Sequence, residues 1–143
     1  EAMTCLCAAP GNEAALARAK GIFDELGKTV IIGEDLMLPA TALTGCGLAF
    51  FLRSVRAASQ GGIQIGFHSD EALLMAAQTA KGAAALLLQT GGGHPESEID
   101  KVTTPRGCTI EGLNRMEHHG FSSAMITGIV TSSDKAASLF KED

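Results

Sequence analysis

The sequence predicts a mostly helical protein that begins with a short β-α-β segment. Two observations support this fold class. Short apolar and β-branched runs occur at residues 3–8 and 29–32, and the second run lies between Gly27 and Gly33, which favours strands. From Pro39 onward, long stretches rich in Ala and Leu are separated by glycine-containing breaks, and this pattern is typical of helices.

Residues 1–36 are expected to form a strand, a helix and a second strand. Asn12 is the predicted N-cap of the helix. Apolar residues follow helical spacing from Leu16, and Gly27 supplies the stop. A β-α-β unit alone leaves sheet edges unpaired, so the segment is interpreted as the end of a longer α/β domain whose first part is missing. The predicted boundary separates it from an all-helical domain over residues 37–143.

The second part of the chain is expected to contain only helices. They are predicted over residues 39–60, residues 70–89, a short stretch after Pro95, residues 110–118 and residues 121–137. Ser69 is the predicted N-cap of the second helix. Gly45 and Gly47 cost about 1 kcal/mol each inside a helix, a cost usually accepted where another backbone approaches closely. Helix 70–89 is apolar nearly all round and must be surrounded, so a second subunit is expected to cover it.

The composition of the chain argues against several function classes. A net charge of −5 and the absence of Trp and Tyr argue against a nucleic-acid surface, and the charge also argues against an anionic membrane. No apolar run is expected to span a bilayer and no signal peptide opens the chain, so the protein is expected to be soluble and cytoplasmic. With 143 residues and 45% hydrophobic content, it is expected to bury a fair core as one domain.

The cysteines and histidines do not follow a metal-binding spacing. The four cysteines include no Cys-x-x-Cys pair, and His118 and His119 are adjacent, so on a helix they point about 100° apart. No metal site is predicted, and the cysteines are expected to be reduced thiols. Gly91-Gly92-Gly93 is interpreted as a helix end and a turn rather than a phosphate cradle, because no strand precedes it.

The best candidate for a ligand site is the turn at residues 103–109. Hydrogen-bonding side chains precede a predicted helix there, and Gly107 allows close approach of the backbone to a ligand. The side chains are those of Thr103, Thr104, Cys108 and Thr109. A helix N-terminus would present free N–H groups and a positive dipole end to a carboxylate or phosphate. The alternative is a capped turn in which Thr109 is only the N-cap of the helix. Local chemistry favours the ligand site and the capped turn equally.

Motifs spread over residues 3–137 give this chain a resemblance to a known family. They are Asp100-x-Val102-Thr103-Thr104-Pro105-x-Gly107-x-Thr109-x-x-Gly112-Leu113 with Glu117 and Gly120-Phe121, Thr41-Ala-Leu-Thr-Gly-Cys-Gly47 with Ala49-Phe50, Ala76-Ala-Gln-Thr79 with Gly82-Ala83, and His94-Pro95. In content and order they resemble pyrroline-5-carboxylate reductase, an enzyme that makes proline by reducing a cyclic imine with NAD(P)H. Several separate motifs in family order are more specific than a lone glycine pattern.

The resemblance implies an oxidoreductase of proline biosynthesis that converts 1-pyrroline-5-carboxylate to L-proline. Residues 1–36 would be the closing β-α-β segment of a Rossmann-like dinucleotide-binding domain, and residues 37–143 the helical dimerisation and substrate-binding domain of an obligate homodimer or higher oligomer. NADP or NAD would be bound mainly by the missing N-terminal domain, because the chain has no Gly-x-Gly-x-x-Gly fingerprint. The chain alone is therefore expected to be inactive.

Site residues are carried over one by one from the resemblance. The Thr104 hydroxyl and the backbone N–H groups of Gly107 and Cys108 would bind the substrate carboxylate. The hydroxyl of Thr109, the implied catalytic group, would bind the ring nitrogen. It would orient the imine and relay a proton from water, since a threonine hydroxyl is too weak an acid to act alone.

The sequence also departs from the family pattern. Arg106 stands where the family commonly has Gly, and Cys46, Leu48, Phe50 and Glu98 differ as well. Arg106 either strengthens carboxylate binding or points to solvent, and solvent is favoured because most Arg side chains are exposed. Two other functions remain open. One is a free-standing, non-catalytic helical dimerisation module, and the other is a hydroxy-acid dehydrogenase, whose expected Lys-x-x-x-Asn helix is not seen here.

Overall fold

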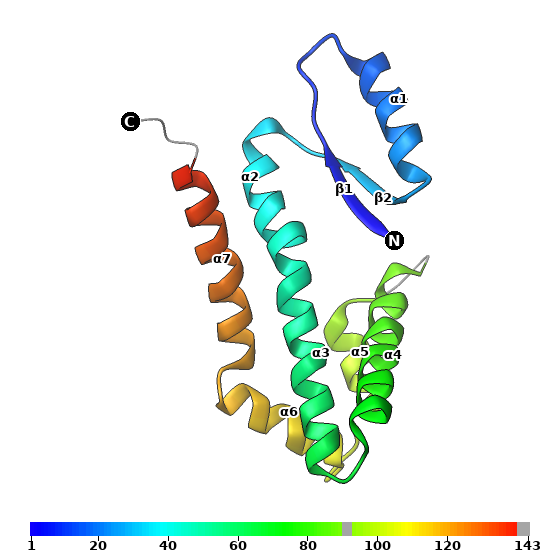
Figure 1. Ribbon diagram of the computed structural model, residues 1–143, viewed down its shortest axis with the longest axis vertical. Coiled ribbons are helices and arrows are strands. Elements are labelled where there is room, and N and C mark those ends of the chain that lie inside the picture. Colours follow the sequence, from blue (N-terminus) through cyan, green and yellow to red (C-terminus); the bar gives the residue numbers. More distant parts are fainter. Residues whose placement is uncertain (90–92, 140–143) are drawn as a thin grey trace. The chain divides into compact units, whose positions relative to one another are not determined.

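The computed structural model describes residues 1–89 and 93–139, with the elements labelled in Figure 1. The described residues form two compact units. The first contains residues 1–49 together with the chain from residue 126, and the second contains residues 50–125. Both described strands belong to the first unit, and helices account for most of the remaining residues. The predicted mostly helical fold with an initial β-α-β segment is therefore confirmed.

The β-α-β segment consists of β1 (Ala2–Leu6), α1 (Glu13–Asp24) and β2 (Gly27–Ile31). The strands pair in parallel, from Ala2 opposite Gly27 to Leu6 opposite Ile31. Helix α1 contacts both strands, as Figure 1 shows. Parallel neighbours need a crossover connection of this kind, because a tight turn can join only antiparallel strands.

Two details at the ends of α1 differ from the expectation. Asn12 is the N-cap residue of α1, as predicted, but its side chain makes no capping hydrogen bond. The Glu13 carboxylate accepts the Gly11 N–H at 3.1 Å instead, and hydrogen bonds from the backbone of Glu13 itself and of Gly11 lower the Glu13 pKa. Gly27 is not the helix stop, because it begins β2 at a place where a Cβ would overlap the backbone of Ala2.

A continuous helical stretch follows β2. It consists of a 3₁₀ turn (Glu34–Leu36), α2 (Met37–Ala40), a π-helical segment (Thr41–Cys46) and α3 (Gly47–Gln64). The predicted helix over residues 39–60 is confirmed, and it is longer at both ends. A Cβ at Gly45 or Gly47 would meet its nearest neighbour at 3.8 Å, an ordinary contact. No described backbone therefore approaches these two glycines closely.

The stretch Glu34–Gln64 is long and apolar enough to cross a membrane, judged by length and composition alone. Its most apolar window has a mean hydropathy of 1.5. The expectation that no apolar run reaches this length is therefore wrong. A helix that a neighbouring subunit covers in water passes the same test, because it also needs apolar residues around much of its circumference.

Helix α4 (Ser69–Leu88) belongs to the second unit and confirms the predicted helix over residues 70–89. It follows a turn at Gly66, whose φ is +116°. The N-cap is His68 and not Ser69, which is the first helical residue. The His68 N–H donates to the Glu71 carboxylate at 3.2 Å, so the acidic side chain satisfies an N–H group at the helix start.

The close approach of α3 and α4 depends on Gly62. A Cβ at this position would lie 3.0 Å from the Cβ of Ala72, which is closer than side chains normally pack. Helix α3 does not stop at residue 60, where the predicted helix ended, but continues through Gly61 and Gly62 to Gln64. Gly62 therefore serves helix packing within the second unit.

Three further helices match the sequence prediction. They are α5 (Pro95–Val102), α6 (Cys108–His118) and α7 (Phe121–Leu139). The interpretation of Gly91 and Gly92 concerns residues outside the part of the chain that the structure describes. Gly93 comes just before the start of α5.

The described part of the chain buries very little apolar surface. Ala42 and Ala72 are the only hydrophobic side chains that are fully buried there, and Ser59 is the only buried polar one. Large apolar side chains stay in solvent: in α4, Leu74 is 70% exposed and Leu88 is 71% exposed. The expectation of a fair core in one domain is therefore wrong for the single chain, whose apolar helices lack the cover that α4 was predicted to need.

The total exposed surface supports the same conclusion. The chain exposes 11024 Å². Two separate globular units of half this mass would expose only roughly 8,400 Å² together, from the scaling of accessible surface with mass. The excess does not depend on how the two units are arranged, because the comparison already treats them as separate.

Candidate functional site

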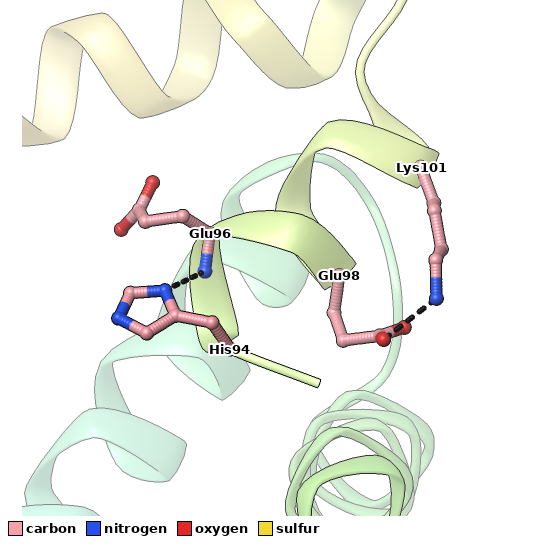
Figure 2. Close-up of polar contacts among 4 residues, drawn as sticks. All are labelled: His94, Glu96, Glu98 and Lys101. Atoms are coloured by element: carbon pink, nitrogen blue, oxygen red, sulfur yellow. Dashed lines mark hydrogen bonds and ion pairs between the residues drawn. The ribbon is translucent and has the colours of Figure 1, made fainter. Parts of the chain in front are cut away.

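Helix α5 leads into the candidate site and is fixed at both ends. Figure 2 shows the His94 ring, whose Nδ1 accepts the Glu96 N–H at 3.3 Å at the helix start. Glu98 and Lys101 form an ion pair at 2.6 Å one turn later. The Thr103 hydroxyl donates to the Asp100 carbonyl at 3.2 Å, which closes the C-terminal end. The backbone therefore leaves α5 in a defined direction at Thr103.

A tight turn connects α5 to α6. The Gly107 N–H donates to the Thr104 carbonyl at 2.9 Å, so Pro105 and Arg106 occupy the two central positions. Arg106 has a φ of +59°, the only positive φ among the described non-glycine residues. Proline followed by a residue of positive φ is the pattern of a type II turn, and the second position normally takes Gly or Asn.

The lack of a side chain at Gly107 leaves room for the Thr104 side chain at the start of α6. A Cβ at Gly107 would overlap the Thr104 hydroxyl and lie 3.0 Å from the Thr104 carbonyl oxygen. The hydroxyl therefore lies directly against the Cα of Gly107. Any larger residue at this position would push Thr104 away from the helix N-terminus.

The N-terminus of α6 presents unoccupied hydrogen-bond donors. Gly107 is the N-cap, and no side chain caps the helix. The N–H groups of Cys108, Thr109 and Ile110 have no acceptor among the described residues. Such groups, with the positive end of the helix dipole, favour an anion. The interpretation of Thr109 as the N-cap is wrong, since Thr109 is the second residue inside α6.

The structure brings the sequence-predicted site residues together in one turn. Thr104, Cys108 and Thr109 are exposed, and Gly107 is half-buried. The Gly107 N–H is already engaged by the Thr104 carbonyl, so the free donors begin at Cys108. The positive φ of Arg106 was not predicted from the sequence, although Pro105 at the preceding position of the turn was an available signal for it.

The far end of α6 is also fixed locally. Gly120 has a φ of +78° and follows the helix as a C-terminal cap, with its N–H donating to the Glu117 carbonyl at 2.8 Å. The Glu117 carboxylate accepts the Ser122 hydroxyl at 2.7 Å. These contacts involve two members of the motif that follows the turn, and they set the connection from α6 to α7.

The motif at residues 41–47 forms the π-helical segment Thr41–Cys46 and the first residue of α3, Gly47. The Thr41 and Thr44 hydroxyls donate to the Met37 and Ala40 carbonyls at 3.0 and 2.8 Å. Both hydroxyls are therefore used within the helix. Ala42 is fully buried, which gives the segment a packing role.

The four cysteines are all free thiols. Cys7 lies just after β1 and donates its Sγ–H to the Glu34 carboxylate at 2.8 Å. This hydrogen bond, together with desolvation and the negative charge of Glu34, raises the pKa of Cys7. No group of three metal-ligating side chains is found within residues 1–89 and 93–139.

The described residues combine a parallel β-α-β segment with helices whose apolar faces are largely uncovered, which defines the class of the protein as mostly helical with a small two-stranded sheet. Residues 34–139 match the family described as pyrroline-5-carboxylate reductase dimerisation. The chain belongs to this family.

Relatives with similar sequences are named pyrroline-5-carboxylate reductases. The chain is 58% identical to pyrroline-5-carboxylate reductase 1 of Dictyostelium discoideum over 154 residues, which cover 99% of this chain and 28% of that protein. It is 36% identical to pyrroline-5-carboxylate reductase of Methanosarcina acetivorans over 137 residues, covering 94% of this chain and 50% of the relative. The chain thus spans half or less of the length of these relatives.

Solved structures show the same fold. The reductase of Streptococcus pyogenes matches with a TM-score of 0.84 and 28% identity, covering 94% of this chain and 52% of that one. A pyrroline-5-carboxylate reductase of Coxiella burnetii matches with a TM-score of 0.89 and 24% identity, covering 96% and 52%. The structure from Plasmodium falciparum, at 21% identity, contains bound NADP.

Proposed function

We propose that this chain is the substrate-binding and dimerisation part of a pyrroline-5-carboxylate reductase, which reduces 1-pyrroline-5-carboxylate to L-proline with NADPH or NADH. The observation that carries the proposal is the open N-terminus of α6, where three N–H groups lack an acceptor beside the exposed hydroxyls of Thr104 and Thr109. Membership of the family supports the reaction class.

The turn would bind the carboxylate of the substrate. Free donors at the start of a helix suit a carboxylate, since both the hydrogen bonds and the dipole favour negative charge. The N–H groups of Cys108 and Thr109 supply the backbone donors, and the Thr104 hydroxyl supplies a third. Gly107 contributes its lack of a side chain, because its own N–H closes the turn.

The Thr109 hydroxyl would serve the ring nitrogen of the substrate. Reduction adds a hydride to the imine carbon and a proton to the nitrogen. The imine accepts a hydride readily when its nitrogen is protonated or hydrogen-bonded, since negative charge otherwise accumulates there. Thr109 would orient the nitrogen and pass on a proton from water, while positioning supplies most of the rate gain.

The nicotinamide cofactor would supply the hydride. The sequence holds no Gly-x-Gly-x-x-Gly fingerprint, so its residues do not fit the pyrophosphate of a dinucleotide. No step of the reaction is assigned to a cofactor contact in this chain. We expect the cofactor to be held mainly by a Rossmann-like domain that joins β1 and β2, and the chain alone to show no turnover.

The proposal is tested by restoring a cofactor domain. The chain is fused to the N-terminal part of the Dictyostelium discoideum reductase, its 58% identical relative, and NAD(P)H oxidation is followed with 1-pyrroline-5-carboxylate. Turnover is expected from the fusion and none from the 143-residue chain alone. A folded fusion without turnover would contradict the proposed reaction and favour a non-catalytic dimerisation module. Turnover by the chain alone would contradict the need for a separate cofactor domain.

A further inference from the structure

His94 fixes the start of α5 through both its backbone and its ring. Its carbonyl accepts the N–H groups of Ser97 at 2.9 Å and of Glu98 at 3.3 Å. Its Nδ1 accepts the Glu96 N–H at 3.3 Å, and Figure 2 draws this hydrogen bond. Pro95, the first helical residue, has no N–H to satisfy. Among the described residues, the His94 ring is therefore the one acceptor of the Glu96 N–H.

Only a neutral imidazole ring can accept this hydrogen bond. An acceptor Nδ1 requires the tautomer that carries its proton on Nε2, whereas an imidazolium ion donates from both nitrogens. Protonation of His94 would leave the Glu96 N–H without its acceptor. It would also place a positive charge at the positive end of the α5 dipole. Histidine side chains ordinarily gain this charge as the pH falls from 8 to 5, and His94 is exposed to solvent.

The charged groups near His94 provide no fixed partner for a protonated ring. Glu96 and Glu98 in the first turn of α5 would attract the cation, but Glu98 already pairs with Lys101 at 2.6 Å. The charged side chains on the other helices of the second unit are Arg53 and Arg56 on α3, Asp70, Glu71 and Lys81 on α4, and Glu111, Arg115 and Glu117 on α6. Within residues 50–89 and 93–125, none of them forms an ion pair or a hydrogen bond with His94.

Helix α5 is too short to tolerate the loss of its cap easily. It has eight residues, which is about two turns, and helices of this length form only marginally in isolation. Loss of the contact at the first turn therefore affects half of the helix.

We propose that His94 is a pH-sensitive cap, which holds the first turn of α5 when its ring is neutral and releases this turn when the ring is protonated. Mild acid would then loosen the helix that leads to Thr103 and the turn before α6. The switch does not depend on the proposed reaction, because every contact that it uses lies within α5 and its N-cap.

An NMR titration of the 143-residue chain from about pH 8 to about pH 5.5 tests this switch. The Cα chemical shifts of Glu96 and Ser97 report the helix population of the first turn, and the ring signals of His94 report its protonation. His94→Asn keeps an N-capping side chain that does not titrate, and His94→Ala removes the capping side chain at every pH. His118→Asn removes a histidine at the end of α6 and is the matched control.

In the unmodified chain, the ratio of helical to unfolded first turn is expected to fall about 3- to 10-fold, as for the loss of one helix cap. The midpoint should coincide with the titration of the His94 ring. His94→Asn should keep constant Cα shifts, His94→Ala should have the lower helix population throughout, and His118→Asn should behave like the unmodified chain.

Two outcomes would overturn the switch. If the Cα shifts of the unmodified chain stay constant while the His94 ring titrates, the ring does not control the helix. If His94→Asn loses as much helix as the unmodified chain, or if His118→Asn abolishes the loss, a different group is responsible.

Discussion

At the scale of single residues, substitution of Thr109 can distinguish a catalytic role from a helix-capping role. The structure places it second in α6 behind the N-cap Gly107, with no capping hydrogen bond from its side chain. Its hydroxyl is therefore free for a ligand, and removing it should not cost the stability that loss of a cap would cost, about 1 kcal/mol. If Thr109 binds the substrate, loss of its hydroxyl should lower activity without lowering the stability of the protein.

Thr109→Ala in the fused enzyme is expected to lower kcat by roughly one to three powers of ten, because one well-placed hydrogen bond to developing charge contributes a few kcal/mol. Thr109→Ser, which keeps the hydroxyl, should retain most of the activity. Thr104→Ala should instead raise KM, since a carboxylate contact is similar in the ground and transition states. Steady-state kinetics and thermal unfolding distinguish these effects. Full turnover by Thr109→Asn would show that the hydroxyl has no direct role.

The Cys7 thiol gives a second prediction at this scale. Its hydrogen bond to Glu34 raises its pKa, so the fraction of reactive thiolate at pH 8 is lowered. Glu34→Gln removes the negative charge and is expected to bring the pKa down and to speed alkylation of Cys7 by iodoacetamide. Mass spectrometry of the alkylated peptides measures this rate, with Cys5 in the same chain as the internal control. An equal rate in both forms of the protein would mean that the contact does not control the thiol.

At the scale of elements, the connection from α5 to α6 depends on Gly107. Gly107→Ala places a Cβ in the Thr104 hydroxyl and is expected to destabilise the protein by about 1–3 kcal/mol, as strained substitutions do. Gly21→Ala is the matched control, because nothing lies within 4 Å of its Cβ position in α1. This control should stabilise by up to about 1 kcal/mol. Chemical denaturation measures both, and equal behaviour of the two variants would contradict the packing of the turn.

Most elements could be predicted from the sequence, whereas several of their ends could not. The alternation of apolar runs with glycine and proline breaks identified each described helix of the second part. The N-cap of α4 was missed because His68 is capped through its backbone by Glu71, while Ser69 offered a more familiar capping residue. Gly27 was assigned to the helix end because a close approach between β1 and β2 leaves no local mark in the sequence.

Part of the candidate site could also be predicted from the sequence. The residue types of the turn and the following helix indicated anion binding, and the resemblance supplied the roles. The positive φ of Arg106 could not be derived from arginine itself, which disfavours that conformation. The engagement of the Gly107 N–H by Thr104 depends on the turn type and therefore also required the structure.

At the scale of the whole molecule, the family and the uncovered apolar surface point to assembly. Residues 34–139 match a dimerisation family, and the chain exposes more surface than two globular units of its mass would. We expect an obligate homodimer that buries about 2,000 Å² or more in total, as obligate interfaces do. The domain boundary after residue 36 stays a prediction.

Leu74→Asp tests this assembly. Leu74 is 70% exposed in the single chain, so a charge there would be harmless to a monomer but costly in an interface. Light scattering is expected to show a dimer for the unmodified chain and a monomer or unfolded chain for the variant. Ile22→Asp, 67% exposed in α1 and outside the dimerisation match, should leave the dimer intact. A folded monomer of the unmodified chain at micromolar concentration would contradict the expectation.

Because a single subunit buries almost no core of its own, some mutations in this protein are expected to be dominant. With only Ala42 and Ala72 fully buried among the described apolar residues, each subunit would depend on its neighbour to complete an interior, and folding would become a second-order event whose midpoint temperature rises with protein concentration. A defective subunit would then impair the normal subunit with which it pairs. In a cell with one altered allele, random pairing would place a faulty subunit in three of every four dimers, and a variant that assembles but cannot complete the shared interior would act dominantly.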